Sequence, residues 1–219
     1  MKVLILGGGG IANGIYQCLE NCGVEVATRA DFDATDLHST SELIRNSGAN
    51  VVINCAGVSY VHKIQGASMV RILEEIHVNL LGSFNVAHAA ANYLENPTMI
   101  FMGSVAGKYG KPNHGGYCAT KAGVISLVQS LAMEGYDAYA ISPGRVDTPM
   151  REHDYPGEDR RTRLDPEQIG DLVLEILEGK YEPGDNLIIR KVGYDTPPIK
   201  VDKGEPWKKE LKVGEPPAI

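Results

Sequence analysis

The sequence predicts an α/β fold in which a doubly wound parallel sheet lies between two layers of helices within a single domain. Short apolar segments alternate with longer segments of helical period along most of the 219 residues. Several of the short segments are apolar throughout, which is typical of parallel strands buried on both faces. A chain of this length is an ordinary size for one such domain.

Six strands and five helices are expected. The strands are predicted at residues 2–6, 24–27, 50–54, 99–102, 138–141 and 186–192. The helices are predicted at 11–20, from Ser39 or Ser41 to 46, at 74–94, 117–133 and 165–177, with Gly23 ending the first and Pro166 beginning the last. Ile76, Leu80, Phe84 and Ala87 are expected on one side of the helix at 74–94. Residues 151–163 and 204–219 are expected to be irregular.

Composition limits the classes of function. A formal net charge of -7 argues against general nucleic-acid binding, and no apolar run is long enough to span a membrane. The four cysteines form no CxxC pair, so no metal site is predicted and reduced thiols in a cytoplasmic protein are expected.

A glycine-rich loop follows the first predicted strand and precedes the first helix. Residues without a Cβ let the backbone approach a pyrophosphate, and the helix N-terminus offers free N–H groups. Gly7 and Gly10 match the first two positions of a G-x-x-G-x-x-G pattern, whereas Asn13 occupies the third and Gly14 follows it. This order of strand, loop and helix predicts a dinucleotide-binding site, in which Asn13 implies a local shift or a looser fit.

Tyr117 and Lys121 share one face of a predicted helix, and Ser104 precedes them after another strand. A neighbouring ammonium group is expected to lower the pKa of the tyrosine, which then transfers a proton to or from a substrate oxygen. A serine hydroxyl beside the tyrosine can hold that oxygen.

Several motifs together resemble the short-chain dehydrogenase/reductase family. Residues 100–107 with 117–121 resemble its catalytic segment, 54–57 its NAAG motif after the fourth strand, 79–82 its helix asparagine motif, and 143–149 its PG-x-V-x-T segment. The motifs occur in family order, and the resemblance covers roughly residues 1–193. It implies a Rossmann-type fold for residues 1–203, with the substrate pocket inside this domain and 204–219 as a C-terminal tail.

The resemblance implies a role for each matching residue. Tyr117 would be the acid/base, Lys121 would bind the nicotinamide ribose, Ser104 would hold the substrate oxygen, and Asn79 would support a proton-carrying water or kink its helix. The residues expected to bind the dinucleotide are Gly7, Gly10, Ile11, Thr28, Arg29, Asp33, Ala34, Asn54, Ala56, Gly57, Tyr117, Lys121, Pro143, Gly144, Val146 and Thr148.

The end of the second strand selects the dinucleotide. A carboxylate there favours NAD(H), whereas Arg29 can bind a 2′-phosphate. NADP(H) is therefore the preferred prediction; NAD(H) remains possible, with Asp31 as the carboxylate and Arg29 merely solvated.

Two segments depart from the family pattern. The stretch between Thr28 and Asp33 is too short for the usual helix between the second and third strands, so the sheet is expected to lose one covering helix. The segment at 150–164, where the substrate lid normally lies, carries four arginines among acidic residues. It is interpreted as a mobile, solvated loop with self-cancelling charges, and the alternative is a site for an anionic substrate. His114 either lines the pocket or is an ordinary loop residue.

The predicted function is an NAD(P)-dependent oxidoreductase that reduces a carbonyl or oxidises an alcohol, with a small-molecule substrate and a homodimer or homotetramer built on the two long helices. The alternatives are a nucleotide-sugar reductase or epimerase of the extended type, and a non-catalytic NADP-sensing protein.

Overall fold

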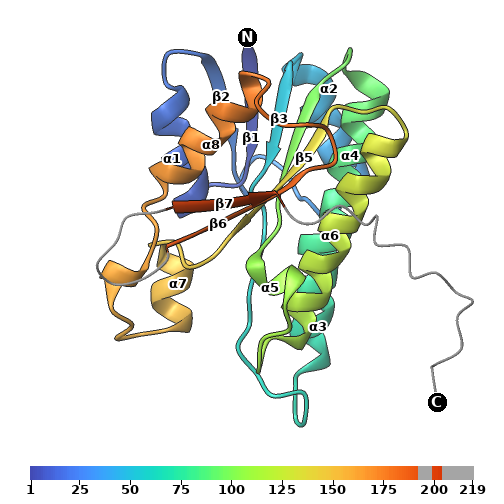
Figure 1. The fold of residues 1–219 in the computed structure, drawn as a ribbon. Helices are drawn as coiled ribbons and strands as arrows, with labels where there is room; N and C mark the ends of the chain where they lie inside the picture. The colour runs from blue at the N-terminus through green and yellow to red at the C-terminus, as the bar shows by residue number, and fades with distance from the viewer. Residues whose placement is uncertain (192–198, 204–219) are drawn as a thin grey trace, which may run out of the picture.

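Seven strands form one sheet in the computed structural model, which describes residues 1–191 and 199–203 (Figure 1). Their order is β2-β1-β3-β4-β5-β6-β7; β1 to β6 are parallel and β7 is antiparallel. The strands are β1 (Lys2–Leu6), β2 (Gly23–Ala27), β3 (Val51–Asn54), β4 (Thr98–Met102), β5 (Ala138–Pro143), β6 (Asn186–Lys191) and β7 (Ile199–Lys203). The doubly wound α/β fold is confirmed. The predicted tail, 204–219, lies outside the described residues.

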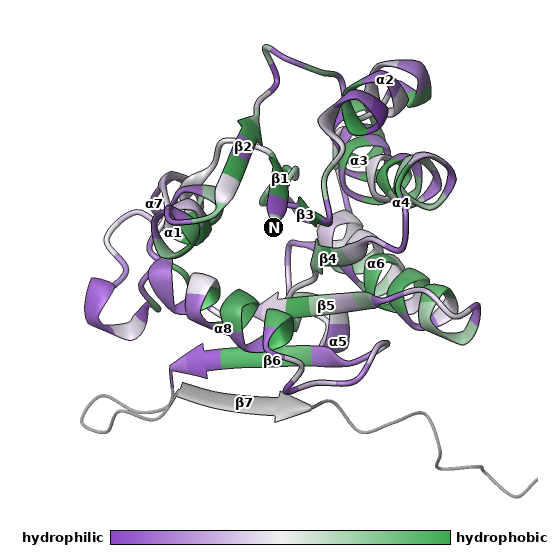
Figure 2. Ribbon diagram, turned by 90° about the horizontal axis from the view of Figure 1, so that it is seen from above, coloured by the Kyte–Doolittle hydropathy of each residue, from purple (hydrophilic) through white to green (hydrophobic). Residues whose placement is uncertain are grey.

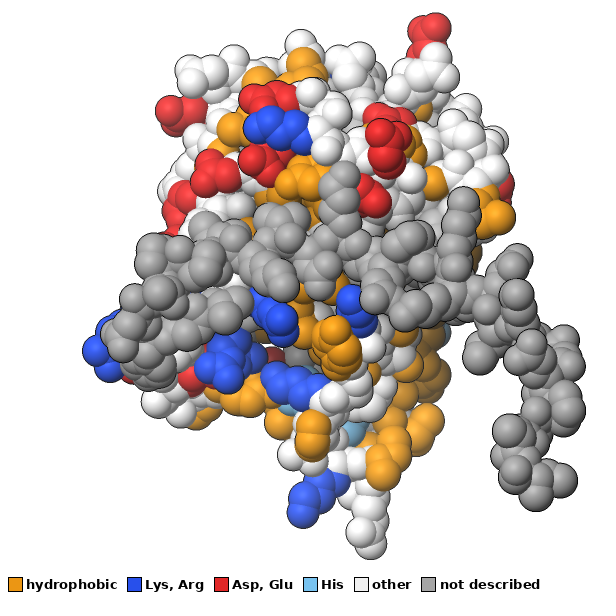
Figure 3. Space-filling view, viewed as in Figure 1, with side chains coloured by type: hydrophobic (Ala, Val, Ile, Leu, Met, Phe, Trp, Pro, Cys, Tyr) orange, Lys and Arg blue, Asp and Glu red, His pale blue; other side chains and the backbone are white. Residues whose placement is uncertain are grey.

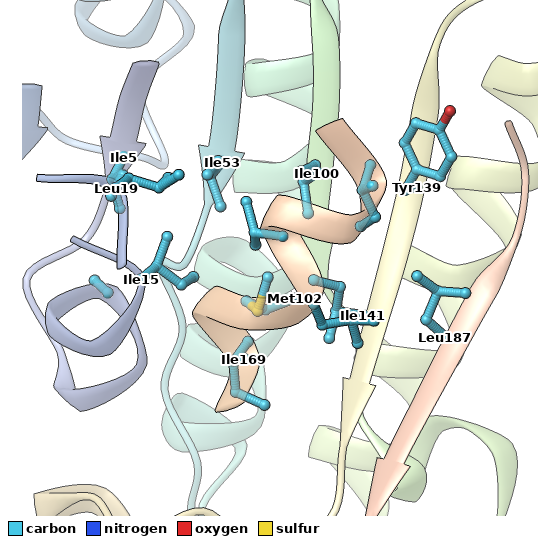
Figure 4. Packing of buried hydrophobic residues seen from close by; sticks show 14 of the residues in the cluster. Ile5, Ile15, Leu19, Ile53, Ile100, Met102, Tyr139, Ile141, Ile169 and Leu187 are labelled. Atoms are coloured by element: carbon cyan, nitrogen blue, oxygen red, sulfur yellow. The ribbon is translucent and has the colours of Figure 1, made fainter. Parts of the chain in front are cut away.

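Helices cover both faces of the sheet (Figure 2). One layer contains α1 (Gly10–Leu19) and α8 (Glu167–Leu177); the other contains α2 (Leu37–Ser47), α4 (Gly82–Tyr93) and α6 (Gly115–Met133). Successive residues of a strand point to opposite faces of the sheet and so belong to different hydrophobic cores. Val3 and Ile5 pack in the core with α1 and α8, whereas Leu4 and Leu6 pack in the core with the other helices. Figure 4 shows the first of these cores between α1, α8 and the central strands.

At its β2 edge the sheet has one strand fewer than the common dinucleotide-binding sheet, whose strand order is 3-2-1-4-5-6. From β2 the chain passes through α2 and crosses β1 to form β3, so the described residues contain neither a strand outside β2 nor its covering helix. The lost helix expected from the short segment after Thr28 is confirmed. The motif at 54–57 consequently follows the third strand of this chain, as the predicted strand at 50–54 implied, although it follows the fourth strand in the family pattern.

The long helix predicted at 74–94 is three segments in succession: α3 (Met69–Glu75), a π-helix at Ile76–Leu81, and α4. A π-helical turn adds a residue to the turn and rotates the side chains that follow it. Ile76 and Phe84 are exposed while Ala87 is buried, so these residues do not form the one apolar face that was predicted.

Two helix ends differ from the prediction for local reasons. Asp36, and neither Ser39 nor Ser41, caps α2, because its carboxylate accepts hydrogen bonds from the His38 and Ser39 N–H groups. Gly23 begins β2 and does not end α1.

Residues 149–164, called the lid below, contain regular secondary structure. They contain α7 (Pro149–Asp154) and a 3-10 turn at Arg160–Thr162, and a β-bridge joins Val146 to Leu164. A further short helix, α5 (Val105–Lys108), follows β4. Within the described part of the chain, no helix combines the length and apolar character needed to cross a bilayer.

Candidate active site

A cleft runs along the carboxyl ends of β1, β3, β4 and β5, where β1 and β3 lead to opposite sides of the sheet. It has two parts: a catalytic cavity of about 930 Å³ and a glycine-loop cavity of about 600 Å³. Both are lined by Ile11, Cys55, Gly57, Thr148 and Met150, so they are continuous. Such a crevice at a switch in strand order is where open α/β sheets bind ligands.

The glycine loop is built for close backbone approach. Gly7 has φ +108°, and a Cβ there would lie 3.0 Å from the backbone of Cys55 and Ala56. Gly9 would meet nothing within 4 Å, and α1 begins at Gly10 without a side-chain cap. The first N–H groups of α1 have no helical acceptor, which suits an anion in the glycine-loop cavity. The residues present therefore fit the diphosphate of a dinucleotide.

Gly14, and not Asn13, supplies the close contact of this helix. A Cβ on Gly14 would lie 2.4 Å from the backbone carbon of Pro166, at the start of α8. Asn13 is exposed, and its N–H donates to the Gly9 carbonyl in an ordinary helical bond. The asparagine in the third pattern position therefore leaves the loop undisturbed.

Ser104, Tyr117 and Lys121 all line the catalytic cavity. Ser104 caps α5, and its Oγ accepts from the Ala106 N–H at 3.1 Å, which leaves the hydroxyl proton available for donation. Tyr117 lies in the first turn of α6 and Lys121 one turn later, with its Nζ 5.7 Å from the centroid of the tyrosine ring. The Lys121 Nζ donates to the Met102 carbonyl at 2.7 Å.

Burial dominates the electrostatics of these side chains. It raises the pKa of Tyr117 to about 12, although a hydrogen bond with Ser104 opposes the rise, and it lowers the pKa of Lys121 to about 8. The expected lowering of the tyrosine pKa by Lys121 is wrong for this geometry, because desolvation is the larger effect. Burial likewise raises the pKa of Cys55, which lines both cavities, to about 12.

Asn79 lies in the π-helix and lines neither cavity. Its Oδ1 accepts from the Val58 N–H at 2.8 Å, and its Nδ2 donates to the Val58 carbonyl and to the Thr120 Oγ1. A Cβ on Gly57 would lie 3.2 Å from the Asn79 Oδ1 and 3.7 Å from the Lys121 Nζ. Asn79 therefore holds the loop after β3 against the helix that carries Lys121.

The structure brings most of the other predicted residues to the cleft. Those lining the glycine-loop cavity are Gly7, Gly10, Ile11, Arg29, Asp33, Ala34, Ala56, Gly57 and Thr148. Those lining the catalytic cavity besides the catalytic group are Pro143, Gly144 and Val146.

Thr28 and Asn54 line neither cavity but shape the adjoining turns. The Thr28 N–H and hydroxyl donate to the Asp31 carboxylate, whose pKa they lower. The Asn54 side chain bonds the Ser83 hydroxyl and the Ala56 N–H.

The lid is held together by ion pairs around Arg163, whose side chain is 0% exposed. Its guanidinium contacts Asp147 at 2.9 Å and Glu152 at 2.7 Å, and lies 3.3 Å from Glu158. The Glu158 carboxylate also receives a two-pronged contact from Arg151. The charges of this segment do cancel in pairs, as expected, and Arg160 and Arg161 are exposed. The interpretation as a solvated loop is wrong for Arg151 and Arg163, because tertiary folding makes their ion pairs internal.

Sequence reasoning missed Tyr155, which lies against the catalytic group through His114. The Tyr155 hydroxyl lies 2.7 Å from His114 Nε2, the two rings are stacked, and the His114 ring centroid is 6.4 Å from that of Tyr117. His114 therefore lines the pocket. Lys111, Arg145 and Arg190 line the catalytic cavity as well. No local pattern marks these residues, because each comes from a different loop or strand end.

Comparison with known proteins identifies the family. The family model described as short chain dehydrogenase matches residues 2–159, and the chain belongs to this family of NAD(P)-dependent oxidoreductases. It is 34% identical over 185 residues to the 3-oxoacyl-(acyl-carrier-protein) reductase MabA of Mycobacterium tuberculosis, covering 79% of this chain and 66% of that protein. The FabG reductase of Thermotoga maritima is 33% identical over 158 residues, 62% of each chain. The chain thus spans slightly less than two thirds of these curated relatives.

Solved structures agree on the fold. Aldohexose dehydrogenase of Thermoplasma acidophilum has a TM-score of 0.74 at 22% identity, covering 90% of this chain and 97% of that chain. An alcohol dehydrogenase of Thermococcus sibiricus, solved with 5-hydroxy-NADP, has a TM-score of 0.73 at 25% identity, covering 90% and 99%. These findings favour the short-chain dehydrogenase interpretation over the nucleotide-sugar and sensing alternatives.

Proposed function

We propose that this protein is an NAD(P)-dependent oxidoreductase that interconverts a carbonyl and an alcohol. The observation that carries the proposal is the convergence of Ser104, Tyr117 and Lys121 from separate elements on one cavity. That cavity continues into the glycine-loop cavity, where the loop glycines and the start of α1 suit a diphosphate.

In this mechanism the dinucleotide, when bound, supplies or accepts a hydride. The Ser104 hydroxyl donates a hydrogen bond to the substrate oxygen, and the Tyr117 hydroxyl gives that oxygen a proton during reduction or receives one during oxidation. Lys121 carries its positive charge at neutral pH, since its pKa of about 8 is still above neutrality, and stabilises the phenolate that forms. Asn79 positions Lys121 by fixing the adjoining loop.

Replacing Tyr117 by Phe tests this mechanism. The expected result is a loss of roughly 10²- to 10⁴-fold in kcat, with dinucleotide binding retained, because the variant lacks only the proton donor. Tyr109→Phe is the matched control, since Tyr109 lines the same cavity but is 54% exposed. Undiminished turnover in Tyr117→Phe would refute the assignment.

NADP(H) is the proposed dinucleotide. Arg29 lines the glycine-loop cavity and is exposed, while the Asp31 carboxylate turns back onto Thr28 and does not line the cavity. The guanidinium is thus available to a 2′-phosphate, although the Asp33 carboxylate also lines this cavity. The similar structure of BdcA, at 20% identity and TM-score 0.76, was solved with NADPH.

Titrations with NADPH and NADH measure this preference. Arg29→Gln is expected to weaken NADPH binding roughly ten- to hundredfold and to leave NADH binding nearly unchanged. Arg45→Gln, on the exposed side of α2, serves as the control. A wild-type preference for NADH would overturn the proposal.

The substrate is proposed to be a small carbonyl or alcohol compound. The mycobacterial and Thermotoga relatives are named 3-oxoacyl-(acyl-carrier-protein) reductases, so 3-oxoacyl compounds are the first carbonyls to assay. Free thiols at Cys18, Cys22, Cys55 and Cys118 support a reducing, cytoplasmic location.

A homodimer or homotetramer is proposed from apolar side chains exposed around α3 and α4. Met69, Val70, Leu73 and Phe84 are 45–74% exposed, and α6 carries no exposed charged side chain. Light scattering of the wild type and Phe84→Asp tests this surface. A larger species that dissociates in the variant is expected; a monomeric wild type would refute it.

A further inference from the structure

The catalytic cavity is unusually rich in positive charge for a chain of net charge -7. Besides Lys121, its lining contains Lys111, Arg145, Arg151, Arg190 and Lys191, against the carboxylates of Asp154 and Glu158. Figure 3 shows Lys and Arg side chains gathered around a hollow in the lower half of this face. The wall of the cavity therefore carries a local excess of cations.

The carboxylate of Glu158 is shared among several guanidinium groups. Arg151 holds it in a two-pronged contact, Arg145 lies 3.4 Å away, and the buried Arg163 lies 3.3 Å away. These contacts, led by the hydrogen bonds from Arg151, lower the pKa of Glu158. Arg163 is also paired with Asp147 and Glu152, so Glu158 is left to balance the two cavity-lining guanidinium groups of Arg145 and Arg151, and positive charge remains in excess on the cavity wall.

Lys111 lines the cavity and has no salt-bridge partner among the described side chains. Its Nζ lies 4.2 Å from the centroid of the Tyr155 ring, and no carboxylate among the described side chains lies within salt-bridge distance of it. The side chain is half-buried, and burial, with Arg151 and Arg145 nearby, lowers its pKa against the opposing effects of the Glu158 and Asp154 carboxylates. A negative charge at this position would relieve both effects.

Arg190 makes a second contribution from β6. Its Cβ lies 3.2 Å from where a Cβ on Gly144 would stand, so the stem of the arginine packs against the segment that follows β5. The described side chains offer this guanidinium no salt bridge either. Arg190 lines the same cavity as Lys111.

We propose that the substrate is an anion: a small carbonyl or alcohol compound bearing a carboxylate or phosphate group. The charged group binds beside Lys111 and Arg190, while the carbonyl or hydroxyl meets Ser104 and Tyr117. This inference rests on the proposed function and names the substrate class of the same site. Arg145 and Arg151, both held by Glu158, add to the positive potential of the same cavity.

Two matched pairs of compounds test the proposal and separate the two sources of negative charge. They are acetoacetate with methyl acetoacetate, and dihydroxyacetone phosphate with dihydroxyacetone. With NADPH saturating, kcat/KM is expected to be roughly ten- to hundredfold higher for at least one anionic member than for its neutral partner. The member that shows this difference identifies carboxylate or phosphate as the preferred group.

Variants of the cavity-lining cations test whether these residues cause the preference for an anionic substrate. Lys111→Met and Arg190→Met are expected to raise KM for the preferred anion about tenfold or more and to leave KM for its neutral partner unchanged. Lys111→Arg is expected to restore most of the anion preference. Lys108→Met removes the same charge from a lysine of α5 that lines neither cavity, and it is expected to change neither constant.

Binding measurements keep this inference separate from the proposed function. The NADP⁺-saturated protein, whose own phosphate site is filled, is titrated calorimetrically with all four compounds. Tighter binding of an anionic member that is lost in Lys111→Met supports the inference even without turnover. Turnover of neutral and anionic partners with equal kcat/KM refutes the inference and leaves the proposed function intact. The inference is also refuted if neither anion binds with a Kd in the millimolar range or below.

Discussion

The glycine loop and the lid face each other across one cleft but are held in place by different forces. The loop is fixed by backbone contacts: Gly7 presses on the strand end at Cys55, and Gly14 lies against Pro166. The lid is fixed by charge, with Arg163 fully buried among the carboxylates of Asp147, Glu152 and Glu158.

This difference matches what each side is proposed to bind. A diphosphate is bound by backbone N–H groups, which it can approach only where side chains are absent. The glycines of the loop allow this approach because they have no Cβ. A substrate is recognised by side chains, which must be held by their neighbours to be selective. Contacts between backbone atoms are insensitive to pH and salt, whereas an ion-pair network responds to both.

Arg163→Met should have the largest effect of the variants that distinguish the lid from the glycine loop, because it should destabilise the lid and leave the loop unchanged. It leaves carboxylates of the lid without their partner, which is strongly destabilising in a buried network. The expected results are a drop in Tm on the order of 5 °C or more, a raised substrate KM and a nearly unchanged dinucleotide Kd. Thermal unfolding and separate titrations of the two ligands measure these quantities.

Arg161→Met is the control for that variant, because Arg161 lies in the same turn but pairs with Asp159 at the surface and is 78% exposed. Its Tm is expected to stay within about 1 °C of the wild type. Equal shifts in both variants would show that the buried network does not hold the lid.

Gly14→Ala should have an intermediate effect on the other side of the cleft. The new methyl group would overlap the backbone of Pro166, and forcing it in should lower the free energy of unfolding by about 1–3 kcal/mol. Asn13→Ala, one residue earlier and exposed, should change it by less than about 0.5 kcal/mol. Denaturant titrations compare the pair; similar values would mean that α1 and α8 adjust freely.

The smallest effect is expected from Lys121, between the two regions. Its pKa falls from an ordinary value of 10.5 to about 8, so above pH 8 the folded protein releases a proton that the unfolded chain keeps. The unfolding free energy should therefore rise with pH by roughly 1 kcal/mol between pH 8 and pH 9.

Lys121→Met removes this contribution, so the wild type minus variant difference isolates it from other titrations. Denaturant unfolding at the two pH values provides the measurement. A difference that stays flat or falls over this interval would contradict a lowered pKa for Lys121.

The sequence predicted the α/β class, the glycine loop and the pairing of Tyr117 with Lys121 from patterns within one strand, loop or helix. The grouping of Ser104 with them came from the resemblance to the family's motifs, because Ser104 lies in another element. The sequence-based predictions failed where the local backbone geometry departs from a regular helix or where a contact with a distant segment matters. A π-helix interrupts the helix predicted at 74–94, whereas periodicity assumes a regular helix, and Ile76 and Phe84 are exposed. It also named Asn13 as a disturbance, since only the approach of α8 reveals that Gly14 carries the close contact.

By itself, the sequence determined the family, the doubly wound fold and the chemistry that the site can perform. Backbone geometry and helical spacing are short-range properties, and they leave a readable pattern. Only the tertiary structure decided that Arg151 and Arg163 of the lid are internal, that Tyr155 reaches His114, and that Lys111 and Arg190 line one cavity. Burial and charge balance depend on residues distant in the chain, so the pKa of Tyr117 and the excess of cations emerge only when the chain is folded.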